Sequence, residues 1–421
     1  MRGGSSRIAI IGGGISGLGA AWYLAPSHDV HVFERAGRLG GHTHTHPVRD
    51  GERELAVDSG FIVYNETTYP LLTALFDELG VETQTTNMSF SMHCERCDLR
   101  YSGLGATGMF VQKRNLANPA FHRLLAAMQR FHTRGRTADV SNGAIVGRTL
   151  EEFVRDVSRD GLGDHYVYPL ASALWSTGIP GVRGFPAETF VSFFRSHRLF
   201  QIRDRLQWRS VVGGSHTYVD AMRHRLEGRT HAGMSVEAVE RQSGFIRVRF
   251  AGGSSQEFDR VIFAVPADEA LRLLKTPSDR ERELLGAWQY AESDTWVHSD
   301  ASFLGREKAS QASWNYHLAD CRAPQAEPTM TYNLNRLQRL GTDTPFLVTL
   351  NPGREPERVT SRMTYRHPVF TTESVATQEA LRQLGGENST FFAGAHLGYG
   401  FHEDGLRSAA DVATRMGVLV T

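Results

Sequence analysis

Two short apolar runs near the N-terminus flank a longer segment of helical character. Arg7–Ile11 and residues 30–33 are runs of the kind that buried parallel strands need, and Ile15–Leu24 between them predicts a helix. Further along, residues 235–239, 259–266 and 391–394 predict strands. Gly405 opens a predicted helix that runs to about residue 416. This order of strands and helices predicts an α/β fold.

The turn between the first strand and the first helix carries a glycine fingerprint. Gly12 permits a tight turn, Gly14 lets the backbone approach a pyrophosphate, and Gly17 lets the helix pack closely against the strand. The helix begins with Ile15 and Ser16, where free N–H groups and the helix dipole favour a negatively charged phosphate. The pattern therefore predicts a Rossmann-type dinucleotide site.

The second strand ends in a carboxylate at the spacing that such a site requires. Glu34 follows Gly14 by twenty residues, so it can accept hydrogen bonds from the hydroxyls of an adenosine ribose. It would repel a 2′-phosphate, which disfavours NADP. A lone glycine fingerprint is a weak signal, but strand, helix and acid together are specific.

Composition bounds the remaining function classes. A chain of 421 residues is long enough for two lobes, each with its own core. Its 46 basic and 46 acidic residues balance, which argues against a nucleic-acid partner. Three cysteines are too few for a disulfide scaffold, and no apolar stretch is long enough to span a bilayer. Glycines interrupt the first apolar run, so we predict no signal peptide and a cytoplasmic protein.

The residues after Glu34 distinguish between dinucleotides. Residues 35–43 and 57–61 resemble the glycine-rich loop and the following segment of the flavin-containing amine oxidase and phytoene desaturase superfamily. The resemblance implies FAD rather than NAD, because NAD dehydrogenases have no equivalent of these segments. No cysteine lies beside the C-terminal flavin motif, so we expect the FAD to be bound non-covalently. With the first turn, it implies a cofactor set of Gly12, Gly14, Ile15, Ser16, Gly17, Glu34, Arg35, Arg38, Gly40, Gly41, His42, Gly60, Phe61, Ile62, Val236, Gly394, Asp404, Gly405 and Leu406.

The C-terminal segment resembles the second FAD motif of the superfamily. Its helix would direct an N-terminus at the flavin N1/C2-carbonyl edge, where negative charge accumulates on reduction. The chain departs from the motif at Ala395, where relatives place an acid that holds the ribityl chain. We expect Asp404 or backbone groups to substitute.

A narrower resemblance covers about residues 7–413. The motifs that carry it are residues 173–176, 194–197, 207–210, 313–316, 349–352, 366–370 and 398–405. Together they are similar to a bacterial group of predicted NAD/FAD-binding oxidoreductases encoded beside cyclopropane-fatty-acid synthase-like methyltransferases. The resemblance is specific for this group but does not assign a substrate.

The superfamily resemblance also implies a division of the chain. The FAD-binding domain would comprise residues 1–90, 206–272 and 385–421. Residues 91–205 and 273–384 would form an α+β substrate (cap) domain.

One cap segment has two interpretations. Residues 116–131 alternate apolar and basic side chains at roughly helical spacing. The segment is either an amphipathic cap helix buried on its apolar side, or a helix that makes peripheral contact with an anionic bilayer.

Candidate chemistry concentrates before the last helix. Amine oxidases of the superfamily usually keep a lysine near flavin N5, and none of the three lysines has a convincing context, so we favour carbon chemistry. His402, Glu403 and Tyr399 are candidates for acid or base work, because they precede the helix that would face the flavin. The alternative is that His402 caps the turn and Glu403 stabilises a helix start. Weaker candidates for pocket walls are Tyr64, Asn65, Trp175, Trp314, Asn315, Tyr316 and His367.

Two metal sites are considered and rejected. Cys94 and Cys97 have metal-ligand spacing, but no second Cys/His pair follows, and the segment fits a hairpin tip between residues 89–93 and 99–101. His42, His44 and His46 would share a strand face, but His42 belongs to the flavin loop. We therefore predict no metal.

The leading hypothesis is an FAD-dependent dehydrogenase or desaturase of a fatty-acyl or lipid-like chain. The alternatives are a flavin-dependent double-bond isomerase, an amine oxidase, and a non-catalytic flavoprotein partner of a lipid methyltransferase. The sequence does not determine the oligomeric state.

Overall fold

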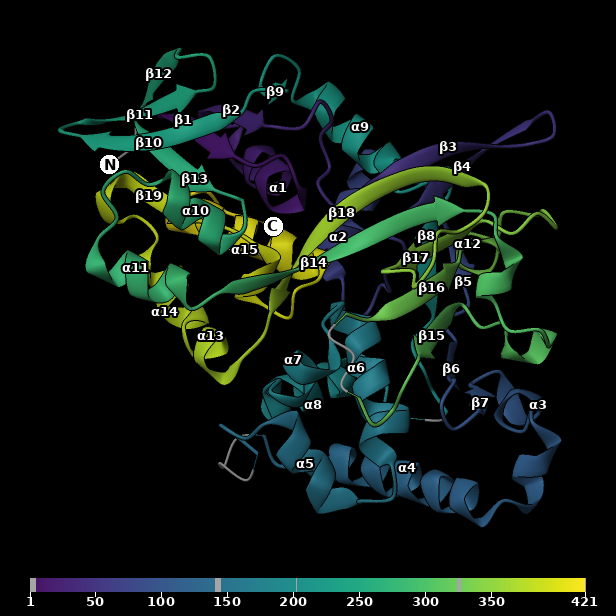
Figure 1. Cartoon of the computed structure of the whole chain (residues 1–421). Coiled ribbons are helices and arrows are strands. Elements are labelled where there is room, and N and C mark those ends of the chain that lie inside the picture. The colour runs from purple at the N-terminus through teal and green to yellow at the C-terminus, as the bar shows by residue number, and fades with distance from the viewer. Residues whose placement is uncertain (1–4, 141–144, 202, 324–326, 421) are drawn as a thin grey trace.

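A five-stranded parallel sheet forms the centre of one lobe (Figure 1). In the computed structural model, which describes residues 5–140, 145–201, 203–323 and 327–420, its middle strand is β1 (Arg7–Ile11). Four residues of β1 are buried, as a strand covered on both faces requires. The strand order is β19 (Thr390–Phe392), β13 (Arg260–Phe263), β1, β2 (Asp29–Glu34) and β9 (Thr230–Ala232). The N-terminal strands and the two later ones predicted for this sheet are confirmed.

Helices α1 (Ile15–Leu24) and α15 (His402–Arg415) pack together beside this sheet. A Cβ on Gly17 would lie 1.9 Å from the Gly12 carbonyl oxygen, so only glycine permits this approach of helix and strand. The last helix begins at His402, three residues earlier than predicted. The reason is a cap: the Asp404 carboxylate accepts a hydrogen bond from the Phe401 N–H at 3.0 Å.

A second, smaller antiparallel sheet packs on the first through aromatic side chains. Phe33 of β2 lies 4.8 Å from Phe250 between ring centroids. The strands of the small sheet are β10 (Val236–Gln242), β11 (Phe245–Phe250) and β12 (Ser255–Phe258). Other helices of this lobe are α2 (Pro70–Leu79), α9 (His216–Arg225), α10 (Ala267–Leu273), α11 (Asp279–Gly286), α13 (Thr372–Ala376) and α14 (Gln378–Leu384). Because α11 contacts α14 and α14 contacts β19, this lobe includes helices that the sequence assigned to the cap.

A seven-stranded mixed sheet forms the cap (Figure 1). Its order is β18 (Val359–Val369), β14 (Gln289–His298), β17 (Leu347–Leu350), β16 (Thr329–Asn333), β15 (Trp314–Leu318), β6 (Phe90–Cys94) and β7 (Leu99–Ser102). The β6–β7 pairing confirms the predicted hairpin. Two further ribbons pair β3 (Thr45–Asp50) with β4 (Arg53–Asp58) and β5 (Thr83–Thr86) with β8 (Trp208–Val211).

Helices cover the end of the cap sheet. They are α3 (Gly105–Met109), α4 (Pro119–Thr137), α5 (Leu150–Val157), α6 (Tyr168–Trp175), α7 (Ile179–Arg183), α8 (Ala187–Ser196) and the short α12 (Leu334–Leu337). Helix α4 begins after Asn118, whose side chain accepts from the Ala120 N–H. None of the helices in the described ranges is both long and apolar enough to cross a membrane.

Helix α4 decides between the two interpretations of the basic and apolar stripe. Phe121, Leu124, Met128 and Phe131 are buried in the cap, while the arginines of the helix are exposed. The interpretation as an amphipathic cap helix is confirmed. The apolar face therefore points into the cap rather than to the outer surface of the protein.

Candidate active site

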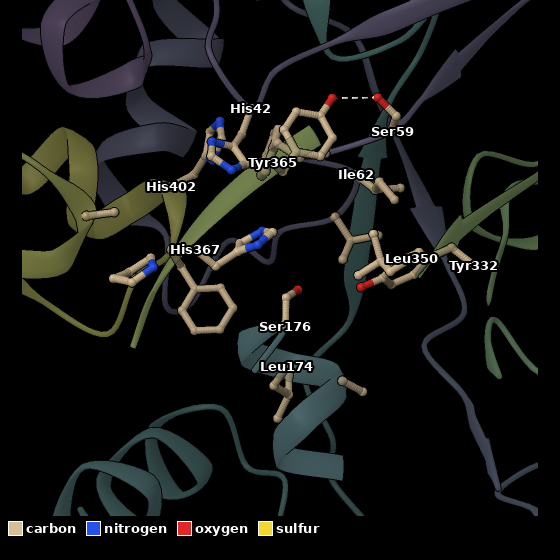
Figure 2. Close-up of a pocket in the computed structure, with 18 of the residues that line it drawn as sticks. His42, Ser59, Ile62, Leu174, Ser176, Tyr332, Leu350, Tyr365, His367 and His402 are labelled. Atoms are coloured by element: carbon tan, nitrogen blue, oxygen red, sulfur yellow. Dashed lines mark hydrogen bonds between the residues drawn. The ribbon is translucent and has the colours of Figure 1, made fainter. Parts of the chain in front are cut away.

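One large cavity runs from the glycine turn of the first lobe into the cap (Figure 2). Its volume is about 1700 Å³. Pockets for one ligand usually measure about 300–1,000 Å³. The cavity is therefore large enough for a cofactor and a second molecule.

The first end of the cavity is formed by the turn between β1 and α1. Gly14 caps α1 without a side-chain hydrogen bond, so the first N–H groups of the helix have no side-chain acceptor there. A Cβ on Gly14 would find only the Cα of Gly41 within 4 Å, at 3.9 Å. The helix start is thus open to the cavity, as a phosphate site requires.

Glu34 holds the loops that surround this site. Its carboxylate accepts hydrogen bonds from the Gly13 N–H and the Ala36 N–H, each at 2.8 Å. Each carboxylate oxygen keeps a second lone pair, so a ribose hydroxyl can still donate to it. Glu34 lines the cavity beside the turn.

Arg38 fixes the glycine-rich loop. Its guanidinium donates to the carbonyl oxygens of Gly41 at 2.8 Å and Thr43 at 3.2 Å. A Cβ on Gly60 would lie 2.1 Å from the His42 carbonyl oxygen, so the segment carrying Gly60 can approach this loop only because that residue is glycine. Arg38 thereby places a positive charge where a diphosphate would lie.

Three histidines and a tyrosine surround the middle of the cavity (Figure 2). The His42 ring lies 4.9 Å from the Tyr365 ring and 5.1 Å from the His367 ring between centroids. Burial lowers the pKa of His42 to about 4 and the pKa values of His367 and His402 to about 3. These imidazoles are neutral at pH 7, and each offers one donor and one acceptor.

His402 is held more firmly than the other two. Its Nε2 lies 2.9 Å from the Thr43 hydroxyl and 3.2 Å from the Tyr218 hydroxyl, and its ring stacks on Phe61 at 3.8 Å. It lines the cavity at the N-terminus of α15. The geometry admits contact with a cofactor, and an acid or base role for His402 stays a prediction.

Four buried side-chain polar atoms around this cavity have no protein partner in the described ranges. They belong to residues that all line it: His42 Nε2, His367 Nδ1, His396 Nε2 and Trp314 Nε1. Buried polar atoms are normally paired, so a ligand with a polar edge fits this set. An isoalloxazine ring has such an edge in its carbonyls and ring nitrogens. The residues present therefore fit a flavin.

Most of the predicted cofactor residues line the cavity. They are Gly12, Gly14, Ile15, Ser16, Glu34, Arg35, Arg38, Gly40, Gly41, His42, Gly60, Phe61, Ile62, Val236 and Gly394. Gly17, Asp404, Gly405 and Leu406 lie behind its wall. The Asp404 carboxylate caps its own helix, and burial raises its pKa to about 6. Asp404 does not substitute for the acid missing at Ala395, which itself lines the cavity, so backbone groups are left for that contact.

Two of the three predicted acid or base residues lie outside the cavity. The Glu403 carboxylate accepts from the N–H groups of Leu71 at 3.2 Å and Leu72 at 3.1 Å, so it caps α2. Tyr399 packs edge-on against Phe193 at 5.7 Å. A catalytic role for Glu403 stays a prediction, and the observed backbone contacts of its carboxylate are with the start of α2. The alternative was that Glu403 stabilises the start of a helix. It does so, but the helix is α2 rather than its own helix α15.

The predicted pocket walls divide in the same way. Trp314 and His367 line the cavity. Four others belong to the protein interior through side-chain contacts: Tyr64 donates to Thr83, the Trp175 ring packs on Phe185 and Phe193, Asn315 bonds Ser91, and Tyr316 donates to Ser172. Asn65 donates to Thr68 and is also buried.

Sequence reasoning missed most of the cap side of the cavity. Leu174, Ser176, Tyr332 and Leu350 line it and come from α6, its C-terminal end, β16 and β17 (Figure 2). Further residues of this chamber are Met109, Phe110, Leu125, Met128, Leu170 and Leu199. Of these residues, only Leu125 and Met128 belonged to a pattern that the sequence analysis had singled out, the apolar stripe of α4. None of the lysines lines the cavity.

The metal prediction also changes with the fold. Cys94, Cys97, His165 and Cys321 place one ligand atom each within 4.8 Å of one another. The second pair that the sequence seemed to lack therefore comes from distant segments. No other group of this kind occurs in the described ranges, and Nε2 of His46 lies 2.7 Å from the Ser59 hydroxyl.

Comparison with known proteins agrees with this architecture. A family model described as flavin containing amine oxidoreductase matches residues 15–299. No curated protein matches the sequence.

Solved structures of the same fold cover nearly the whole chain. A CLA-producing fatty acid isomerase from P. acnes is 17% identical with a TM-score of 0.67, covering 97% of this chain and 98% of that chain. A putative protoporphyrinogen oxidase from Exiguobacterium sp. 255-15 is 16% identical with a TM-score of 0.69, covering 98% and 99%. Cyclohexylamine oxidase from Brevibacterium oxydans IH-35A is 15% identical with a TM-score of 0.69, covering 98% and 100%. At these identities the likeness concerns the fold alone.

Proposed function

The chain belongs to the flavin-containing amine oxidoreductase family and is an FAD-dependent oxidoreductase, and from that premise we propose that it dehydrogenates an apolar chain with an anionic head. The flavin, when bound, accepts a hydride at N5 from a substrate carbon. The protein supplies position, a dry cavity and neutral hydrogen-bonding groups.

The observation that carries the proposal is the apolar lining of the cap chamber. Leu125 and Met128 of α4 line this part of the cavity, as do Leu170 and Leu174 of α6. An apolar lining binds an alkyl chain by removing its surface from water, at about 25 cal/mol per Å². Small polar substrates would gain little there.

Arg205 supports an anionic head in this part of the cavity. Burial and, to a smaller extent, the charges of Arg205 and Arg136 lower the pKa of His132. Arg205 and His132 both line the cavity, and Arg205 is exposed. Within the described ranges no ion pair includes Arg205, so its charge is available for a carboxylate or phosphate.

The alternatives differ in what they need from the protein. An amine oxidase of this superfamily would be expected to carry a lysine near N5, which this cavity does not offer. A double-bond isomerase would use the same apolar chamber and return the hydride to another carbon. A non-catalytic flavoprotein partner of a lipid methyltransferase would bind flavin without reducing it.

We propose that FAD is held non-covalently. Each cysteine of the chain lies outside the cavity, so none is placed to form a thioether with the flavin. Acid precipitation should release all the yellow colour into the supernatant. Colour that stays with the pellet would contradict this.

Anaerobic flavin bleaching tests the reaction. The purified holoprotein is mixed separately with long-chain fatty acids, phospholipids, acyl thioesters and amines, and the product masses are measured by mass spectrometry. We expect bleaching by an anion-headed chain and a product two hydrogens lighter. A product of unchanged mass means isomerisation, bleaching by amines alone means amine oxidation, and a flavin that stays yellow throughout means a partner protein; each overturns the proposal.

A matched pair of variants tests the head-group contact. Arg205→Gln should weaken binding of an anion-headed chain about tenfold or more, because a charged hydrogen bond contributes about 1.5–3 kcal/mol. Arg203→Gln, which changes an exposed arginine outside the cavity, is the control and should leave it unchanged. Equal effects of both variants, or an equal effect on the uncharged methyl ester, would contradict the assignment.

Peripheral contact with an anionic membrane stays a prediction, now limited to the basic outer face of α4. Liposome flotation with anionic and neutral vesicles tests it, and equal recovery from both would remove it.

A further inference from the structure

All three cysteines of the chain meet in the cap, together with one histidine. The Sγ atoms of Cys94, Cys97 and Cys321 and one ring nitrogen of His165 lie within 4.8 Å of one another. Cys97 Sγ lies 3.4 Å from His165 Nε2. None of the four residues lines the flavin cavity.

Sheet register accounts for two of these ligands. β6 and β15 pair in parallel, with Cys94 opposite Leu318 at the end of both strands. Cys321 follows three residues later, on the loop that leaves β15. The two thiols therefore meet because two strands end at the same edge of the sheet.

A tight turn places Cys97 beside the first two thiols, and a helical turn places His165 there. After β6 the chain turns back with a hydrogen bond from the Asp98 N–H to the Glu95 carbonyl, which returns Cys97 to the side of Cys94. His165 lies in the π-helical turn Gly163–Val167 that precedes α6. Distortions of this kind inside helices are frequent at functional sites.

Neighbouring residues orient His165 toward the three thiols. His165 presents Nε2 to the thiols, while its Nδ1 lies on the side of Gly161, and the His165 backbone N–H donates to the Gly161 carbonyl at 3.0 Å. The Tyr101 hydroxyl donates to the His165 carbonyl at 2.6 Å and fixes the turn.

We propose that Cys94, Cys97, His165 and Cys321 bind one Zn²⁺ ion. Three sulfurs and one imidazole nitrogen form a set that favours Zn²⁺ in tetrahedral geometry. On binding, the three S–H groups lose their protons to solvent, three S–Zn bonds and one N–Zn bond form, and nothing is oxidised or reduced. Four protein ligands leave no open position, so the site is structural.

The ion would brace the cap side of the flavin cavity. It would join the β6–β7 hairpin, the π-helical turn and the loop after β15. These segments adjoin Tyr101, Tyr166 and Trp314, which line the cavity. Loss of the ion should therefore loosen the substrate chamber more than the dinucleotide turn in the other lobe.

Metal content of the purified flavoprotein tests the proposal. Protein produced in zinc-supplemented medium and handled without chelators should contain about one zinc per chain. Cobalt added to apoprotein under reducing conditions should give the absorption of tetrahedral Co²⁺ with sulfur-to-cobalt charge transfer. Folded, yellow protein that holds less than about 0.1 zinc and gives no cobalt spectrum would overturn the site. So would a mass two hydrogens lighter in the protein as purified from zinc-supplemented medium, because it would show a disulfide in place of the metal.

Variants separate ligation from folding. Cys97→Ser changes an exposed position and should remove at least about 90% of the zinc while the flavin spectrum is retained. His317→Gln is the control, because this half-exposed histidine lies on β15 near the site but is not one of the four ligands. It should keep its zinc. Equal zinc content in Cys97→Ser and wild type would overturn the assignment.

Discussion

Replacing Gly14 by alanine separates phosphate binding from the stability of the fold. Gly14 has φ −78° and ψ −174°, an extended conformation that alanine also adopts. The added methyl would meet only the Gly41 Cα, at an ordinary 3.9 Å. We therefore expect the free energy of unfolding of the apoprotein to change by less than about 1 kcal/mol.

FAD binding should respond much more strongly to the same change. The methyl would lie in the space that a diphosphate needs in order to reach the first N–H groups of α1. One lost hydrogen bond to a charged group costs about 1.5–3 kcal/mol, so the dissociation constant should rise roughly 10- to 150-fold. Titration of apoprotein with FAD, followed by quenching of flavin fluorescence, measures this ratio.

Gly37→Ala is the control for Gly14→Ala. Gly37 lies in the following loop, outside the cavity, and an added Cβ there meets nothing within 4 Å. Its FAD affinity and stability should match those of the wild type. If Gly14→Ala stays folded and binds FAD within about twofold of the wild type, the first turn is not the phosphate site.

Three further predictions concern single groups. Glu403→Gln removes the charge that caps α2 and should lower the free energy of urea unfolding by about 1–2 kcal/mol with turnover unchanged; lost turnover at unchanged stability would instead support a catalytic role. Trp314→Phe removes an unpartnered buried N–H, so stability should stay within about 0.5 kcal/mol, and a larger loss would reveal a partner. Burial lowers the pKa values of His42, His367 and His402, so these neutral imidazoles contribute fully to apoprotein stability above pH 6.5. Below that pH the free energy of unfolding should fall by up to about 1.4 kcal/mol per pH unit for each histidine, down to about pH 4 for His42 and about pH 3 for the other two. A free energy of unfolding that does not change with acidification would contradict this.

The sequence was sufficient for the dinucleotide end because that end is local. Strand, turn, helix and the acid at Glu34 lie within about thirty residues, and the glycine positions are set by backbone geometry rather than by distant neighbours. Gly14 and Glu34 accordingly line the cavity as predicted. The predicted starts of β1 and α1 are confirmed to the residue.

The direction of individual side chains was decided only by the tertiary structure. His402 and Glu403 are adjacent in the sequence, yet one lines the cavity and the other caps α2, because successive side chains on a helix differ by about 100°. The sequence shows that both precede a helix but not which face meets the flavin. Trp175 and Trp314 were likewise both predicted to be pocket walls, and only the tertiary structure shows that Trp314 lines the cavity while Trp175 packs in the interior.

Long-range pairing determined the rest. Cys94 and Cys321 are more than two hundred residues apart and become neighbours only because β6 pairs in parallel with β15. His165 joins them from a helical turn in a third segment. Local spacing carries no information about strands that meet edge to edge. The glycine turn could therefore be predicted from neighbouring residues, whereas the thiol cluster is assembled only by the folded cap.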